Sequence, residues 1–109
     1  MEVWNRAADL SFSLFRLADA LDGKRLYRFA EQLRSATLSI TNNIAEGSGS
    51  ASAPDFRNFL NMARRSVFEV ANILIILTRQ STFAEADTAP LVNELEEESR
   101  MLLGFMRSL

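Results

Sequence analysis

The chain has 109 residues, 48% of them hydrophobic and 24% charged, which is enough for one folded domain and too apolar for a disordered chain. It contains no cysteine and no histidine, which excludes disulfides, thiolate nucleophiles and Cys/His metal sites. The net charge of −2 conceals a segregation, because residues 24–79 carry eight basic and four acidic side chains, whereas residues 80–109 carry two basic and six acidic ones.

The first predicted helix covers about residues 3–21, where apolar side chains recur at helical spacing. They form two stripes, one made of Trp4, Ala8, Phe12 and Phe15 and the other of Leu10, Leu14, Leu17 and Leu21. One bundle core needs only one such stripe, so this helix has more apolar surface than a single core can cover. We expect Gly23 to end the helix in the left-handed conformation, which glycine adopts without steric cost.

The second predicted helix covers about residues 24–46, where an unbroken apolar stripe lies opposite Arg25 and Arg28. The segment that follows, Gly-Ser-Gly-Ser-Ala at residues 47–51, has no apolar periodicity. It is predicted to be a flexible connection of ordinary length between neighbouring helices.

The third predicted helix covers about residues 53–79 and has a clear start signal. Ser52 can accept a hydrogen bond from a free N–H of the first turn, Pro54 costs nothing there, and Asp55 lies at the positive end of the helix dipole. The helical period continues from this start without an internal glycine or proline.

The end of this third helix is unusually apolar, at seven of eight positions in residues 70–77, although the run is far too short to span a membrane. A helix that is apolar all round must be covered all round, and one four-helix core cannot cover every side chain of this run. We therefore predict an oligomer interface that contains Ile73, Ile75, Ile76, Trp4 and Phe12.

The fourth predicted helix covers about residues 87–107. We expect Asp87 or Thr88 to cap it, because an earlier start would place Pro90 where it breaks a backbone hydrogen bond. Its acidic residues, predicted to form a solvated outer face, are Glu94, Glu96, Glu97 and Glu98. A carboxylate metal site of the di-iron type is not expected, because that pattern needs histidines on inward faces. Four helices with short connections predict a single domain, residues 1–109, folded as an all-α, up-down-up-down antiparallel four-helix bundle.

A polar stripe on the second helix is formed by Ser39, Asn43 and Glu46, which are spaced at i, i+4 and i+7. We expect these side chains to join the third helix in a polar network through Arg64, Arg65 or Ser66, and a contact with a ligand is the alternative.

Two groups of basic residues are candidates for binding nucleic acid. Lys24, Arg25 and Arg28 crowd the start of the second helix, where the helix dipole disfavours cations. They are either neutralised by Asp19 and Asp22 or available to an anionic partner. The second group lies on the third helix and consists of Arg57, Arg64 and Arg65. Phosphate contact and pairing within the fold are both open for each group.

Four stretches of the chain form a recognisable pattern, namely EQLRSA at residues 31–36, SITNNIAEGSG at 39–49, DFRNFL at 55–60 and MAR at 62–64. This pattern resembles the signature of the four-helix bundle family also called 23S ribosomal RNA intervening-sequence proteins. The positions of the polar network that belong to this signature are Ser39, Asn43, Glu46, Gly47, Ser66 and Glu69.

The resemblance implies a bacterial four-helix bundle that assembles into a homopentamer around a central channel. Members of this family are encoded within intervening sequences of large-subunit ribosomal RNA genes or elsewhere in bacterial genomes. Their role is not established, and nucleic-acid binding is a proposal. The family is similar in fold to accessory proteins of diversity-generating retroelements, which bind a reverse transcriptase and nucleic acid.

We therefore expect a non-enzymatic oligomeric bundle, without cofactor or metal, that binds RNA or DNA through basic residues of its second and third helices. The alternative is a protein-interaction adaptor, such as a reverse-transcriptase accessory protein, without a direct nucleic-acid function. The expected partners are further copies of the chain, then nucleic acid or another protein, and no membrane. Since the N-terminus lacks a basic segment followed by an apolar run, we expect the protein in the cytoplasm.

Overall fold

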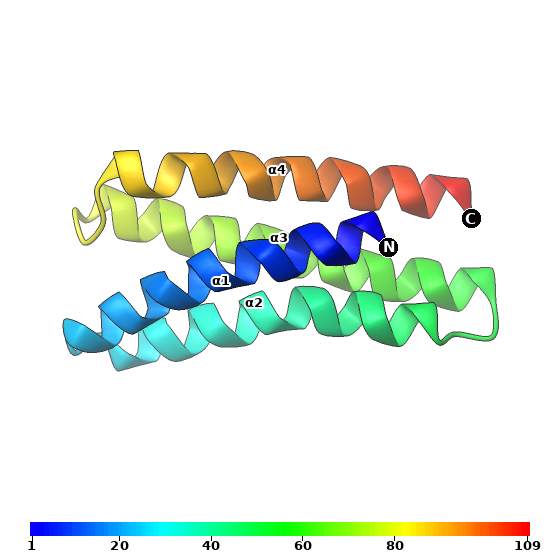
Figure 1. Ribbon diagram of the computed structural model, residues 1–109, viewed down its shortest axis with the longest axis horizontal. Helices are drawn as coiled ribbons and strands as arrows, with labels where there is room; N and C mark the ends of the chain where they lie inside the picture. Colours follow the sequence, from blue (N-terminus) through cyan, green and yellow to red (C-terminus); the bar gives the residue numbers. More distant parts are fainter.

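The computed structural model describes all residues from 1 to 109 and consists of four helices without a strand (Figure 1). They are α1 (Glu2–Gly23), α2 (Tyr27–Ser48), α3 (Ala53–Arg79) and α4 (Glu85–Ser108). Each helix packs antiparallel against the next in the chain, and the molecule measures 44 × 22 × 18 Å. The all-α four-helix bundle predicted from the sequence is therefore confirmed. None of the helices combines the length and the apolar character needed to cross a lipid bilayer.

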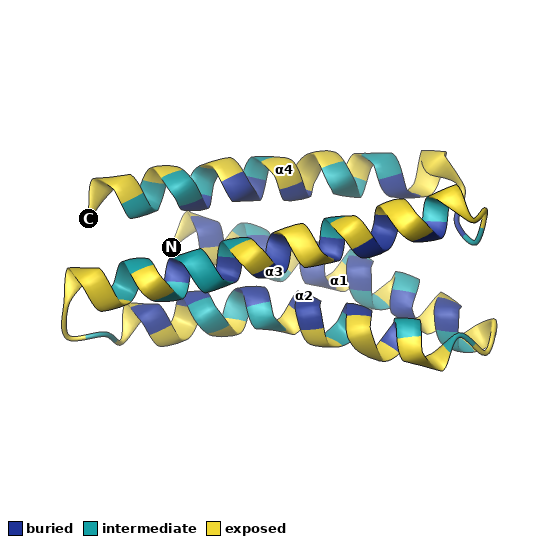
Figure 2. Ribbon diagram, turned by 180° about the vertical axis from the view of Figure 1, so that it is seen from behind, coloured by how far each residue is buried: buried dark blue, intermediate teal, exposed yellow.

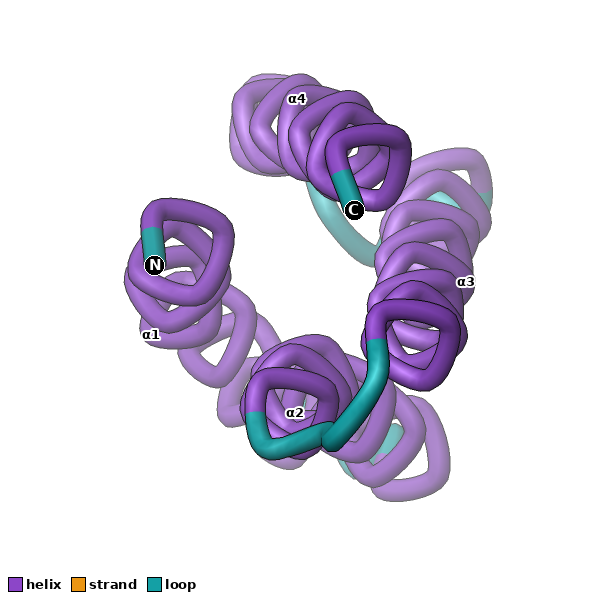
Figure 3. Tube along the Cα trace, turned by 90° about the vertical axis from the view of Figure 1, so that its right-hand side faces the viewer, coloured by secondary structure: helices purple, strands orange, loops and turns teal.

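The core is one cluster of 21 buried hydrophobic residues drawn from all four helices and the α3–α4 loop. Figure 2 shows that the buried positions of each helix face the bundle axis. Among the four pairs of neighbouring helices, α1 and α4 form the smallest interface. Viewed along the bundle, α1 lies opposite α3 and α2 lies opposite α4, and α1 is inclined to the others (Figure 3).

The turn between α1 and α2 differs from the prediction in its mechanism. Gly23 remains helical, and the left-handed residue is Arg25, with φ of 62°. The amide of Leu26 donates to the carbonyl of Leu21, and that of Arg25 to the carbonyl of Asp22, at 2.9 Å each. This pair of bonds is a Schellman motif, which requires the left-handed residue two positions beyond the glycine. The prediction that α2 begins near Lys24 was wrong, because the turn occupies residues 24–26.

The predicted flexible connection after residue 46 also needs correction, because α2 continues to Ser48. Gly47 is buried within the last turn, where the two helices approach closely. A Cβ atom on this glycine would lie 2.7 Å from the Cβ of Phe59 and 2.9 Å from Cδ1 of Phe56. Gly47 therefore serves helix packing rather than chain flexibility.

The start of α3 follows the sequence signal, since the hydroxyl of Ser52 accepts a hydrogen bond from the amide of Asp55 at 3.2 Å. The start of α4 does not, because the helix begins at Glu85 and includes Pro90. Both Pro90 and Ala86, whose carbonyl loses its helical partner, are exposed. Water can serve that carbonyl, so the early start is tolerated.

Candidate functional site

The six basic candidate residues do not lie on one surface. Lys24, Arg25 and Arg28 lie around the α1–α2 turn, at one end of the long axis. The other three, Arg57, Arg64 and Arg65, lie in the first half of α3, which starts at the opposite end (Figure 1).

The group at the α1–α2 turn is not neutralised by the two nearby aspartates. Asp19 and Asp22 both accept hydrogen bonds from Nη2 of Arg34, at 2.7 Å each. Hydrogen bonds from the guanidinium to Asp22 and then to Asp19 raise the pKa of Arg34 above its ordinary value. The ammonium of Lys24 donates to the carbonyl of Thr82 at 2.9 Å. Arg25 and Arg28 are left exposed without a carboxylate partner.

The group on α3 is mostly occupied within the fold. Nη1 of Arg57 donates to the carbonyl of Leu109 at 2.7 Å. Nε of Arg64 donates to the hydroxyl of Ser99 at 3.2 Å, and its guanidinium lies 5.1 Å from the centre of the Phe68 ring. Only Arg65 of this group is exposed and without a hydrogen-bond or ion-pair partner.

A polar network connects the middle of α2 with α3. The hydroxyl of Ser39 accepts hydrogen bonds from Nδ2 of Asn43 at 3.0 Å and from the hydroxyl of Ser66 at 2.9 Å. Together with Met62, Arg65 and Glu69, these three residues line a shallow pocket of about 340 Å³. The network does not include Glu46, which is exposed, or Arg64, which contacts α4 instead.

Large apolar side chains are exposed on two opposite sides of the bundle. On α1, Phe12 is 68% exposed and Trp4 is 39% exposed. On the α3 side, the exposed residues are Phe68, Ile75 and Ile76. Figure 3 places these two helices across the bundle from each other.

The predicted oligomer interface must be corrected at one position. Ile73 is only 7% exposed and belongs to the core, so it is not available to a second chain. The helical period explains the difference, because Ile73 follows Val70 by three positions on the buried stripe, whereas Ile75 and Ile76 fall outside it.

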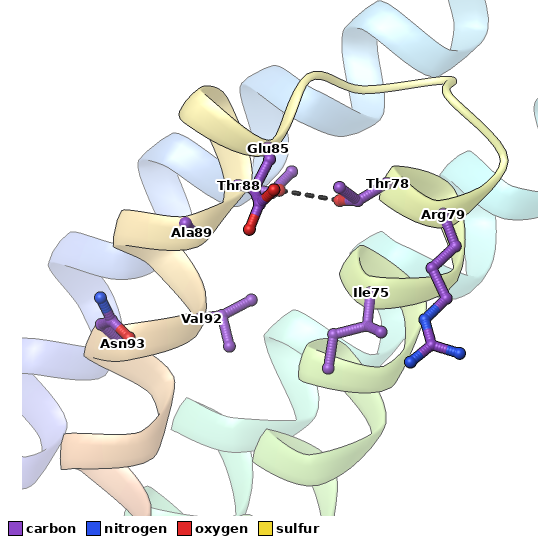
Figure 4. Close-up of a pocket in the computed structure, with 8 residues that line it drawn as sticks. All are labelled: Ile75, Thr78, Arg79, Glu85, Thr88, Ala89, Val92 and Asn93. Atoms are coloured by element: carbon purple, nitrogen blue, oxygen red, sulfur yellow. Dashed lines mark hydrogen bonds between the residues drawn. The ribbon is translucent and has the colours of Figure 1, made fainter.

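Beside Ile75, a pocket of about 430 Å³ opens between α3 and α4 (Figure 4). Ile75 and Val92 face each other across it, and the hydroxyls of Thr78 and Thr88 are hydrogen-bonded to each other at 2.8 Å. Arg79, Glu85 and Asn93 also line the pocket. Its lining is therefore mixed, with the apolar side chains of Ile75, Ala89 and Val92 beside polar and charged ones.

The prediction that Glu98 belongs to a solvated acidic face was wrong, because its side chain is fully buried at the α1–α4 seam. Nη2 of Arg6 contacts Glu94 at 2.8 Å, whereas Nε of Arg6 is 3.6 Å from the nearer oxygen of Glu98. Neither oxygen of Glu98 has a hydrogen-bond partner. Burial raises the pKa of Glu98 to about 7, against the opposing effect of Arg6.

The spacing of the sequence contains a signal for this buried carboxyl group. Glu98 follows Leu95 by three positions and precedes Leu102 by four, so it falls on the buried stripe of α4. Arg6 likewise precedes Leu10 by four positions. Two opposite charges on the core-facing stripes of different helices indicate a contact between those helices.

Comparison with known proteins gives a family and a fold. The family model described as 23S rRNA-intervening sequence protein matches residues 1–104. A solved structure of a protein of unknown function from the S23 ribosomal protein family of Bacteroides thetaiotaomicron is similar, with a TM-score of 0.90. The two chains are 22% identical, over 95% of this chain and 97% of that one, so this likeness shows the fold alone. No curated protein matches the sequence. The chain belongs to the family of 23S rRNA-intervening sequence proteins.

Proposed function

We propose that the protein is a non-enzymatic bundle that assembles into a closed ring of identical copies. The observation that supports this proposal is the pair of apolar surfaces on opposite sides of the bundle, one centred on Phe12 and the other on Ile75. A chain with two different complementary surfaces forms head-to-tail contacts, and these close into a ring when the rotation between copies allows it. The family resemblance implies that the ring has five members.

The shapes of the two surfaces favour this mode of contact. Phe12 is the most exposed of the large apolar side chains, so it projects from α1 as a knob. The recess beside Ile75 and Val92 is a hole on the other side of the molecule. Contact of the Phe12 ring with Ile75 and Val92 in this recess would remove apolar surface from water, which stabilises by roughly 25 cal/mol per Å² of apolar surface buried.

Complementation between two variants tests the head-to-tail arrangement. Phe12→Lys removes the knob and Ile75→Lys blocks the recess, so each variant alone should be monomeric with unchanged helicity. An equimolar mixture should give a heterodimer and nothing larger, because one intact surface remains on each partner. Tyr27→Lys, which replaces another exposed ring at the end of the bundle, is the matched control and should assemble like the wild type. Assembly of either single variant to the wild-type mass contradicts the proposal.

The ring would also give the basic residues a function. Arg25 and Arg28 lack carboxylate partners and lie at one end of the bundle. A ring places the same end of every copy on one rim. Two positive charges in one chain bind a polyanion only weakly, but the ring repeats the pair once per copy around the rim. We propose that this rim binds the phosphate backbone of RNA or DNA.

A salt titration of binding tests this second proposal. Affinity for a structured RNA or a DNA duplex should fall steeply with salt, with a slope of about 0.9 per phosphate contact on duplex DNA. Arg25→Asn combined with Arg28→Gln should weaken binding and flatten the slope. Arg107→Gln, at the exposed end of α4, is the matched control and should leave both unchanged. No binding at low salt contradicts the proposal. A protein partner retained through nuclease treatment and high salt supports the adaptor function instead.

A further inference from the structure

The seam between α1 and α4 is closed at one end and open at the other. Towards the α1–α2 turn it widens into a groove of about 810 Å³, lined by Leu17, Phe83 and Leu91 among others. Towards the N-terminus of α1 it is bridged by Arg6, the one residue whose ion pairs link the two helices. At this end of the smallest interface in the bundle, the ionic contact between the two helices depends on a single guanidinium group.

Arg6 faces two carboxyl groups, but it is hydrogen-bonded to only one of them. Its Nη2 atom is hydrogen-bonded to the exposed Glu94 at 2.8 Å. Its Nε atom, also buried, lies 3.6 Å from Glu98, which is beyond hydrogen-bond distance. Both oxygens of Glu98 are thus buried without a hydrogen bond. An ionised carboxylate in that position is destabilising, since it has lost water and gained no adequate partner.

We propose that Arg6 and Glu98 form a proton-sensitive latch that keeps the α1–α4 seam closed while Glu98 is protonated and loosens it when Glu98 ionises. The neutral carboxyl group tolerates the apolar surroundings. Once ionised, it gains hydration only if the N-terminal part of α1 moves away from α4.

Among the other charged groups around Glu98, Arg6 opposes the effect of burial and Glu2 adds to it. From α1, Arg6 lowers the pKa of Glu98 and Glu2 raises it, but the largest effect is burial, which raises the pKa to about 7. On α4 itself, Glu94 occupies part of Arg6. No charged side chain of α2 or α3 is buried, and Arg64 of α3 donates to the neighbouring Ser99.

The direction of the pH dependence follows from the two states of the seam. With the seam open, Glu98 is in water and has a pKa near its ordinary value of 4.5. The closed seam therefore binds the proton more tightly, so its stability is greatest at low pH and is lost as pH rises through about 7. Since each unit of pKa difference is a factor of ten, the opening constant rises by up to about tenfold per pH unit between those values.

Hydrogen exchange followed by mass spectrometry tests the latch on the full chain. Exchange of peptides from the N-terminal half of α1, corrected for the intrinsic rate, should accelerate from pH 5 to pH 7 and level off above that. Peptides from the middle of α3 serve as the internal reference and should keep their protection. Glu98→Gln, which cannot ionise, should remove the pH dependence in α1. Glu97→Gln changes the adjacent residue, whose partner is Arg100, and should leave it intact.

Two results would overturn the latch. One is the same pH dependence of α1 exchange in wild type and Glu98→Gln, and the other is an equal change in α1 and α3, which indicates global unfolding. If Glu98→Gln does not fold, the carboxyl carbon of Glu98 can be titrated in the wild type by NMR. A midpoint between pH 6 and 8 supports the latch, whereas a midpoint below 5 contradicts it.

Discussion

Arg25 and Ser81 are the two residues other than glycine with a positive φ, 62° in each case. Each follows the end of a helix, and each lies in the same motif, since Thr82 donates to the carbonyl of Leu77 just as Leu26 donates to that of Leu21. A side chain in this conformation carries a strain of roughly 1 kcal/mol or more. Gly23 lies near the first turn and was predicted to be the left-handed residue. The prediction was wrong because the sequence does not reveal which residue of the turn takes that conformation.

The strain at Arg25 predicts an unusual substitution effect. Arg25→Gly should stabilise the protein by about 0.5–1 kcal/mol, because glycine adopts positive φ without a Cβ penalty. Arg65→Gly removes another exposed arginine, this one from the interior of α3, and should destabilise the protein by about the same amount. Urea unfolding of both variants measures the two free energies. Destabilisation by both substitutions would contradict the left-handed assignment.

The close contact at Gly47 predicts an opposite pair of effects at two helical glycines. Gly47→Ala should destabilise by about 1–3 kcal/mol, since the added methyl group meets Phe56 and Phe59 and forces α2 and α3 apart. Gly104→Ala adds the same methyl group to α4, where nothing lies within 4 Å. It should stabilise by about 0.5–1 kcal/mol. Thermal unfolding compares the two, and equal effects would rule out a packing role for Gly47.

At the scale of helices, most helix positions could be predicted from apolar periodicity and capping residues. The start of α3 at Ala53 could be predicted because Ser52, Pro54 and Asp55 act locally, within one turn. The start of α4 could not, because it depends on whether a carbonyl four residues before Pro90 is exposed, and exposure is a property of the folded molecule. The end of α2 lies two residues later than predicted, since Gly47 belongs to its last turn and packs against Phe56 and Phe59 of α3, a contact between helices that the local sequence does not reveal.

Pro90 interrupts the backbone hydrogen bonding of α4, so Pro90→Ala is predicted to raise the stability of the protein. Alanine restores the amide donor for the carbonyl of Ala86 and should stabilise the protein by about 1 kcal/mol, less the effect of a more flexible unfolded chain. Pro54→Ala is the matched control, because the amide at the first turn of α3 has no helical partner to gain. Pro54→Ala should leave the free energy of unfolding unchanged or lower it slightly. An equal response at both prolines in urea unfolding would show that α4 starts after Pro90.

At the scale of the whole molecule, the sequence predicted that some apolar surface is left over but not where it lies. The stripe of Trp4 and Phe12 on α1 is exposed as its excess apolar content indicates. Ile73 was misassigned because seven apolar positions out of eight conceal which of them face the core. The basic residues share a region of the sequence, yet antiparallel folding places the start of α2, which contains Arg28, and the start of α3, which contains Arg57, at opposite ends of the bundle.

The molar mass of the native protein at micromolar concentration, measured by light scattering during size-exclusion chromatography, tests the central claim most directly. The two opposite apolar surfaces predict one closed species whose mass is an integral multiple of 12.2 kDa. Five copies is the multiple that the family resemblance implies. A single peak at 12.2 kDa that persists as the concentration is raised would contradict self-assembly.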